Sequence, residues 1–187
     1  MEIHSEDKQI ILRDFIKSDI NDYVRWHTSD IEWMNWDSPW EAMGSTVQEE
    51  LRYWTEYYRK VTKTPRKIQT RLEIVLNNNE KTHIGWVIRY NIDKNYNDTA
   101  GKGYCTIGID IPEPQYRGQG YGYRALQTFI RYLQENGIAS IYMQTWSGND
   151  VMIGLANKLG FQECYRIIGT RTVQGRRYDA LTFVLLP

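Results

Sequence analysis

One segment of the sequence, residues 104–126, constrains the fold of this chain more than any other: YCTIGIDIPEPQYRGQGYGYRAL. Its first part alternates in the manner of a strand. Pro112 and Pro114 end that strand, because a proline has no amide hydrogen to give to a neighbouring strand. Glycines at three alternate positions follow, and the apolar spacing after them predicts a helix. The segment therefore predicts a strand, a glycine-rich loop and a helix in direct succession.

The glycine-rich loop, residues 117–122, has the composition of an anion-binding site. Gly118, Gly120 and Gly122 allow the backbone to approach a ligand closely and to direct successive amide groups at it. The positive end of the following helix dipole adds to these amides, and Arg117 supplies a permanent charge for phosphate oxygens. The loop therefore predicts binding of a pyrophosphate group.

Other uses of such a loop fit the sequence less well. A Walker-type phosphate loop requires Gly-Lys followed by Ser or Thr, whereas Gly122 precedes Tyr123 and Arg124. A dinucleotide-binding fingerprint has its third glycine one position later and needs an acidic residue after the next strand. The strand expected at residues 140–146 leads instead to a Ser-Gly-Asn sequence. A glycine-rich turn that merely begins a helix is the remaining alternative.

Hydrophobic spacing divides the rest of the chain into alternating elements. Strands are expected at residues 10–15, 71–76, 83–92, 103–111, 140–146, 161–172 and 177–186, and helices begin near residues 18, 45, 118 and 149. A meander followed by strand–helix–strand units predicts an α/β fold, with a mixed sheet of about seven strands and helices on both faces. Because we find no linker or internal repeat, residues 1–187 are expected to form a single domain.

Composition excludes several classes of protein. The formal net charge is zero, with 23 Lys and Arg against 23 Asp and Glu, so nucleic acid is not an expected partner. No apolar run approaches the roughly 20 residues of a membrane span, and the polar N-terminus is unlike a signal peptide. Two cysteines, Cys105 and Cys164, are too few for a disulfide framework. These features predict a cytoplasmic protein.

The glycine-rich loop and a second motif resemble those of the GNAT family of N-acetyltransferases. The sequence QYRGQG, residues 115–120, matches the family signature Gln/Arg-x-x-Gly-x-Gly/Ala. Downstream, NDVM at residues 149–152 and KLGF at residues 158–161 resemble the second motif. The order of elements is also similar to that of the family, in particular the branch that contains ribosomal-protein N-terminal acetyltransferases. The resemblance implies a mostly antiparallel sheet that is splayed at the strand ending near Ile111.

The resemblance also implies an acetyl-CoA site and no metal. Backbone groups of Ile109 and Ile111 would bind the pantetheine arm and the thioester carbonyl. Asn149 would hydrogen-bond the cofactor, although asparagine is also a good helix N-cap. Lys158 would reach the phosphates or simply face solvent. The loop that would hold the pyrophosphate comprises Arg117, Gly118, Gln119, Gly120, Tyr121 and Gly122.

An aromatic and acidic segment is the best indication of the acceptor. Between residues 28 and 51 there are six acidic residues and no Lys, Arg or His. In the family this segment walls the acceptor side, where carboxylates and indole rings would attract and enclose a cation. Alternatively, the tryptophans pack the helices on the sheet and the carboxylates face water. The candidate acceptor-binding residues are Trp33, Trp36, Asp37, Trp40 and Glu41. Six cations between residues 59 and 71 either form a solvated loop or meet a cofactor phosphate.

Acetyl transfer to an amine requires a base, because an alkyl ammonium with a pKa of about 10.4 is almost fully protonated at neutral pH. Strand alternation makes Asp110 a candidate, and Glu73 on the earlier strand is another; His27 and His83 are further alternatives. The positions where the family often carries a general acid hold Ala156 and Met152, so water or Tyr165 would protonate the leaving thiolate. Cys105 is expected in the core, because direct transfer needs no acyl-enzyme.

The sequence therefore predicts an acetyl-CoA-dependent N-acetyltransferase. The expected acceptor is the primary amine of a small cationic molecule such as a polyamine, an amino sugar or an aminoglycoside. A peptide or protein α-amine is the second possibility for an enzyme. A CoA-binding module without turnover and a nucleotide-binding protein are alternatives from other classes. A homodimer through edge strands or the aromatic surface is also compatible with the sequence.

Overall fold

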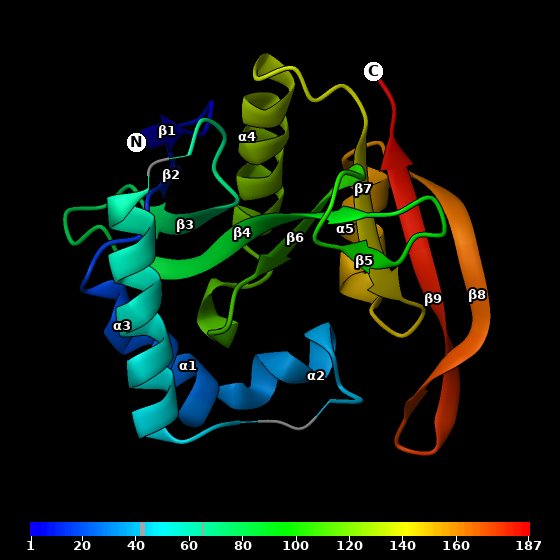
Figure 1. Ribbon diagram of the computed structural model, residues 1–187, viewed down its shortest axis with the longest axis horizontal. Helices are drawn as coiled ribbons and strands as arrows, with labels where there is room; N and C mark the ends of the chain where they lie inside the picture. The colour runs from blue at the N-terminus through cyan, green and yellow to red at the C-terminus, as the bar shows by residue number, and fades with distance from the viewer. Residues whose placement is uncertain (42–43, 65) are drawn as a thin grey trace.

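The computed structural model describes residues 1–41, 44–64 and 66–187, which form one open, twisted sheet with helices on both faces (Figure 1). The strand order is β1-β2-β3-β4-β6-β7-β9-β8, and β5 pairs with β4 beside this path. The strands are β1 (Glu2–His4), β2 (Ile10–Arg13), β3 (Arg71–Leu76), β4 (His83–Ile92), β5 (Asp98–Thr99), β6 (Tyr104–Asp110), β7 (Ile141–Trp146), β8 (Gln162–Val173) and β9 (Arg176–Leu185).

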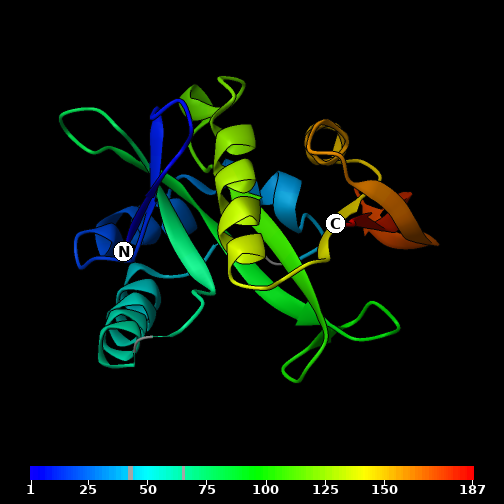
Figure 2. The same cartoon turned by 90° about the horizontal axis from the view of Figure 1, so that it is seen from above.

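The helices divide between the two faces of the sheet. In Figure 1, α4 (Tyr121–Glu135) lies on one side, while α1 (Asp19–Thr28), α2 (Met34–Asp37) and α3 (Val47–Lys63) lie on the other. The last helix, α5 (Asp150–Lys158), lies beside the β8–β9 hairpin, as the view from above shows (Figure 2). Two short 3₁₀ turns, η1 (Ile31–Trp33) and η2 (Pro114–Tyr116), complete the described elements. Of these helices, none combines the length and apolar character that a membrane crossing requires.

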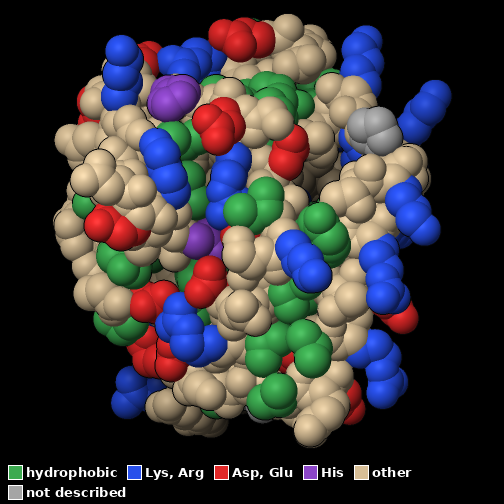
Figure 3. Space-filling model, turned by 90° about the vertical axis from the view of Figure 1, so that its left-hand side faces the viewer, with side chains coloured by type: hydrophobic (Ala, Val, Ile, Leu, Met, Phe, Trp, Pro, Cys, Tyr) green, Lys and Arg blue, Asp and Glu red, His purple; other side chains and the backbone are tan. Residues whose placement is uncertain are grey.

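Each face of the sheet has its own core. Under α4, aliphatic side chains such as Leu126 and Leu133 form one core with Ile74 and Ile107 of the sheet. All four side chains are fully buried. On the opposite face the core is aromatic, because α1 and α3 bring their rings onto Trp86 of β4. That N-terminal aromatic cluster comprises Phe15, Tyr23, Trp26, Trp33, Trp54 and Trp86. Lys, Arg, Asp and Glu side chains are interspersed over the outer surface on this side of the molecule (Figure 3).

The sheet opens where β6 and β7, its parallel pair, diverge. These two strands pair at Thr106 with Tyr142 and at Ile107 with Met143. On its other side β6 remains paired with β4 as far as Asp110 and Trp86. The backbone of β6 beyond Ile107 therefore has one paired edge and one edge turned toward the opening. This geometry confirms the splay expected near Ile111.

The predicted fold class is confirmed, with two corrections to the elements. The sheet has nine strands rather than about seven, because β1 and β5 are also present. These strands have only three and two residues, so they are too short for a periodic pattern that a sequence can reveal. The helix expected to open at Gly118 begins at Tyr121, since Gly120 is its N-cap in the left-handed region at φ 81°.

Candidate active site

A cavity of about 420 Å³ lies between α2, the strands around the splay and the β8–β9 hairpin. Its acidic lining comes from Asp37, Glu41 and Asp98. The aromatic walls are Trp40, Tyr90, Tyr96, Trp146 and Tyr165, contributed by segments that are far apart in the sequence. Its volume lies within the range of small-molecule sites, roughly 300–1,000 Å³. Of the predicted acceptor residues, Asp37, Trp40 and Glu41 therefore line a cavity.

The remaining two predicted acceptor residues lie elsewhere. Trp33 is buried in the N-terminal aromatic cluster, where its indole nitrogen donates to the Trp26 carbonyl at 2.8 Å. Trp36 is exposed, and its ring nitrogen donates to Glu32. Trp33 is thus an example of the packing alternative, because its apolar ring completes the cluster between α1 and β4.

The backbone of Trp36 attaches α2 to the far side of the splay. Its carbonyl oxygen accepts hydrogen bonds from the Trp146 indole at 2.9 Å and from the Asn149 amide at 2.8 Å. The Asn149 side-chain oxygen accepts from the Met152 amide at 3.0 Å and so caps α5. Asn149 is therefore the N-cap that its residue type favours, and its remaining donor holds the acidic segment against β7.

Asp110 lies at the end of β6, on the same face of the sheet as the cavity residue Tyr90, but it is not itself among the residues that line the cavity. It is the cross-strand neighbour of Trp86, and it is half-buried. Burial first, and then the negative charge of Asp37, raises the pKa of Asp110 well above its usual value. The charges of Arg71 and Arg117 oppose this shift without cancelling it. A carboxylate with a raised pKa is a stronger base than an exposed one, which suits it to accept a proton from an ammonium group.

Asp37 and Tyr90 show the same influence of the cavity. Desolvation by the cavity walls, followed by the charge of Glu41, raises the pKa of Asp37. Burial, then the charges of Asp98 and Asp37, raises the pKa of Tyr90, which therefore remains a neutral hydroxyl at physiological pH. The cavity thus concentrates negative charge in a partly desolvated space, and such a space favours a cationic ligand.

Glu73, the other candidate base, lies in a buried ionic network. It is fully buried beside Arg71, it accepts a hydrogen bond from the Tyr23 hydroxyl at 2.6 Å, and it lies 3.1 Å from His83. Charge from Arg71 and His83 lowers the pKa of Glu73, although burial opposes that shift. The Glu73 carboxylate is engaged by Arg71, Tyr23 and His83, so the network's geometry is that of a structural cluster. His27 packs there too, and burial lowers its pKa.

The glycine-rich loop contains two glycines with left-handed backbone conformations, Gly118 at φ 71° and Gly120 at φ 81°. A Cβ on Gly120 would meet the Arg124 guanidinium, whereas Gly122 lies in the first turn of α4 against the side chains of Ile109 and Ile111. The first amides of α4 have no intrahelical partner because every helix begins with such free donors. The loop therefore directs a helix N-terminus toward the end of β6.

The side chain of Arg117 points back into its own segment. Its Nε donates to the Ile111 carbonyl at 2.8 Å, and a terminal nitrogen donates to Pro112. The other terminal nitrogen pairs with Glu32 at 2.6 Å. In this geometry Arg117 fixes the path between the strand and the loop and joins it to η1.

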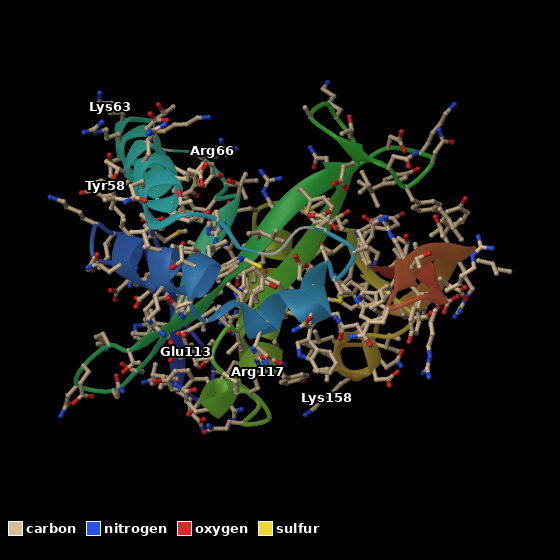
Figure 4. The ribbon with its side chains drawn as sticks, turned by 90° about the horizontal axis from the view of Figure 1, so that it is seen from below. Tyr58, Lys63, Arg66, Glu113, Arg117 and Lys158 are labelled. Carbon is tan, nitrogen blue, oxygen red and sulfur yellow. The ribbon has the colours of Figure 1, made fainter. Side chains whose placement is uncertain are left out.

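Lys158 lies on the same side of the molecule as the glycine-rich loop, whereas the six cations between residues 59 and 71 lie elsewhere. The Lys158 ammonium lies 4.6 Å from the ring centre of Tyr123, in the first turn of α4. Figure 4 shows Lys158 and Arg117 toward one side of the molecule and Lys63 and Arg66 at the opposite side.

The expectation of a solvated loop is wrong for most of the six cations. Arg59, Lys60 and Lys63 are exposed on α3, and Arg71 begins β3 and pairs with the buried Glu73. Arg66 and Lys67 are exposed in the connection between α3 and β3.

The positions of the usual general acids hold no titratable group. Ala156 is fully buried, and Met152 packs against the core. Tyr165 lines the cavity, where its ring stacks on that of Tyr96 with centroids 4.5 Å apart. Cys105 is buried, and burial raises the pKa of its thiol, as expected for a small core residue.

Some of the cavity lining escaped the sequence analysis. Tyr90 and Trp146 lie on strands that were predicted, but strand alternation does not show which ring faces a cavity. Arg171 of β8 lines the cavity and lies 4.4 Å above the Trp40 ring. No sequence signal points to it, because it approaches the cavity through an irregularity in the β8–β9 pairing.

Comparison with known proteins agrees with this geometry. A model of the acetyltransferase (GNAT) domain matches residues 9–162. The chain belongs to the GNAT acetyltransferase family. A search of curated proteins found no significant match to the sequence.

Solved GNAT-like structures share the fold over almost the whole chain. A GNAT-family acetyltransferase from Bacillus anthracis is 15% identical with a TM-score of 0.72, over 100% of this chain and 98% of that one. The ribosomal-protein-S5-alanine acetyltransferase from Vibrio fischeri is 17% identical with a TM-score of 0.70, over 100% and 96%. A Salmonella typhimurium protein solved with its cofactor acetyl-CoA is 15% identical with a TM-score of 0.68, over 95% and 93%. These identities are low, so the likeness concerns the fold.

Proposed function

We propose that this GNAT protein transfers the acetyl group of acetyl-CoA to the primary amine of a small cationic molecule, by direct attack and without an acyl-enzyme. The observation that carries the proposal is the cavity at the splay, in which Asp37, Glu41 and Asp98 are the acidic lining residues. Polyamines, amino sugars and aminoglycosides are the classes of acceptor whose positive charge matches this acidic lining. We expect the reaction to take place in the cytoplasm.

Acetyl-CoA fits the residues on the α4 side of the opening. The amides of residues 117–122 and the first turn of α4 would hold the pyrophosphate, because they combine free donors with the positive end of a helix dipole. The open edge of β6 near Ile109 and Ile111 would supply backbone groups for the pantetheine arm and the thioester. Lys158 adds a positive charge next to this helix terminus. When bound, acetyl-CoA supplies an acetyl group activated as a thioester.

On the acceptor side, this chain's residues would prepare the amine and orient it. The cavity carboxylates would attract the ammonium form, and Asp110 would remove its proton. The amine nitrogen then forms a bond to the thioester carbonyl carbon, the carbon–sulfur bond breaks, and the nitrogen loses its second proton to water as the amide forms. The thiolate leaves with a proton from water or from Tyr165, and the proton on Asp110 returns to solvent. A thiol with a pKa near 8.5 is a good leaving group, so the absence of an acid at Ala156 and Met152 is compatible with turnover.

Two alternatives have specific support. A protein or peptide α-amine as acceptor is favoured by the name of the Vibrio fischeri relative, which acts on a ribosomal protein. A CoA-binding module without turnover is favoured by Ala156 and Met152 at the positions of the usual acids. The cavity argues for the small molecule, because its volume of about 420 Å³ and its aromatic and acidic lining are those of a small-molecule site.

Thiol release from acetyl-CoA tests the proposal across polyamines, aminoglycosides, amino sugars, amino acids and peptides with varied N-termini. We expect turnover with a small amine and a loss of about 10²-fold or more in kcat for Asp110→Asn, as for other general bases. Glu80→Gln, which changes an exposed carboxylate in the β3–β4 turn, is the matched control and should leave kcat unchanged. Turnover with peptides alone would favour the α-amine alternative, and silence with tight CoA binding would favour the module.

A further inference from the structure

One cation lines the acidic cavity, and the proposed mechanism does not use it. Arg171 lies with its guanidinium carbon 4.4 Å from the centre of the Trp40 ring. It shares the cavity with Asp37 and Glu41, yet within the described parts of the chain no carboxylate lies within ion-pair distance of it. An arginine that faces a cavity without a carboxylate partner has donors available for a ligand, whereas a purely structural arginine is generally paired.

Two other arginines of the same hairpin, Arg166 and Arg177, show the contrast. Arg166 pairs with Glu163 at 2.7 Å and with Asp179 at 2.6 Å. Arg177 donates to the carbonyl of Gly169 at 2.9 Å. Both side chains are therefore committed to the hairpin itself, and Arg171 differs from them in facing the cavity.

An irregularity in the hairpin sets the position of Arg171. Ile167 is paired with Ala180 and Arg171 with Tyr178, so β8 advances by four residues between these pairs while β9 advances by two. The Asp179 carboxylate holds this bulge, because it accepts the Gly169 amide at 2.8 Å. Bulges bend a strand and redirect its side chains, and they are frequent beside active sites. The bulge places Arg171 over the acceptor cavity rather than in solvent.

The cavity therefore has two poles. Asp37 and Glu41 come from the α2 side, and Arg171 comes from the hairpin, where its guanidinium lies over the Trp40 ring. A polyamine satisfies the carboxylates but brings a second positive charge toward the arginine. A molecule with an amine at one end and an oxyanion at the other satisfies both poles, since a guanidinium matches carboxylate and phosphate oxygens in a bidentate manner.

From these observations we infer that the acceptor carries an anionic group, a carboxylate or a phosphate, which Arg171 binds while the cavity carboxylates receive the amine. The inference rests on the proposed acetyl transfer and narrows its substrate class to zwitterionic amines, such as an amino acid or the phosphate of an amino sugar. Arg171 would therefore be a specificity-determining residue that binds the acceptor and takes no part in the acetyl transfer itself.

Matched pairs of amines test the inference on the full chain. Lysine and cadaverine differ by a carboxylate, and glucosamine 6-phosphate and glucosamine differ by a phosphate, so the two pairs also distinguish the sources of the oxyanion. We expect kcat/KM for an anionic member to exceed that of its partner by about tenfold or more, as for a charge-assisted bidentate contact. Arg171→Gln should abolish this preference through KM while leaving the KM for acetyl-CoA unchanged, and Arg171→Lys should restore part of it.

Arg176→Gln is the control, because Arg176 is an exposed arginine at the end of the same hairpin, outside the cavity. Equal kcat/KM within both pairs would overturn the inference and leave the proposed function standing. An equal loss for both members in Arg171→Gln would also overturn it, because it would show that Arg171 only packs on Trp40. If none of the four amines is acetylated while peptides are, the small-molecule proposal and the inference both fail.

Discussion

His83 provides a prediction whose magnitude follows from the structure. Its ring is buried between the carboxylates of Asp22 at 2.9 Å and Glu73 at 3.1 Å. Burial disfavours the charged ring, but these two partners, together with Asp19, outweigh it and raise the pKa of His83 to about 9. The ordinary value is about 6.5, and one pKa unit corresponds to about 1.4 kcal/mol, so the protonated ring contributes about 3 kcal/mol to stability.

The sign of the pH dependence follows from this raised pKa. Because the folded-state pKa exceeds the unfolded one, the stabilisation is fully present below about pH 6.5 and is lost as the pH rises toward about 9. Urea denaturation at intervals between about pH 6 and pH 10 measures it as the free energy of unfolding. We expect that free energy to fall by about 3 kcal/mol more in the wild type than in His83→Gln over this range.

His4→Gln is the matched control, because His4 is exposed and its replacement should leave the pH dependence as in the wild type. His83→Gln should also be less stable at pH 6, because it removes one of the cations that compensate the charges of Glu73 and Asp22. Identical pH slopes for the wild type and His83→Gln would refute the assignment of a charged, buried ring.

Further predictions concern the site. Asp37→Asn should lower the pKa of Asp110, because it removes a negative neighbour, and should therefore move the acid limb of the kcat/KM profile to lower pH. An acid limb at the same pH as in the wild type would show that the charge of Asp37 does not act on the catalytic base. Gly120→Glu should abolish CoA binding, measured by calorimetry on the folded variant, because it brings a side chain and a negative charge to the left-handed N-cap of α4. The control variant Gly101→Glu, which changes an exposed loop, should bind CoA as the wild type does. Asn149→Ala should destabilise the protein by about 1 kcal/mol through the lost cap and raise the KM of the acceptor, because the Trp36 carbonyl loses a donor. An unchanged acceptor KM would show that the bond to Trp36 does not order the cavity.

Local signals in the sequence predicted most of the fold. The helix expected to begin near residue 45 is α3, which Thr46 caps, and the spacing of Leu126, Phe129 and Leu133 marks the buried face of α4. The two prolines after β6 correctly indicated the end of that strand. The short strands β1 and β5 gave no such signal, because two or three residues are too few to show a period.

The candidate site was less accessible to sequence reasoning, since it depends on how distant segments meet. Strand alternation correctly placed Asp110 on the face of β6 opposite to Ile109. No pattern in the sequence distinguished the cavity residue Trp40 from the core residue Trp33. Both are tryptophans in one acidic segment, and only tertiary packing distinguishes them. The position of Arg171 depends on a two-residue bulge, whose register no single-sequence pattern determines.

The most direct test of the central claim is thiol release from acetyl-CoA by the wild type and Asp110→Asn, measured side by side with the best amine of the panel. The account predicts turnover by the wild type, a loss of about 10²-fold or more in Asp110→Asn, and unchanged acetyl-CoA binding in both. Wild-type protein that binds acetyl-CoA but acetylates no amine would contradict the claim of catalysis. Equal turnover by the two proteins would contradict the assignment of Asp110 as the base.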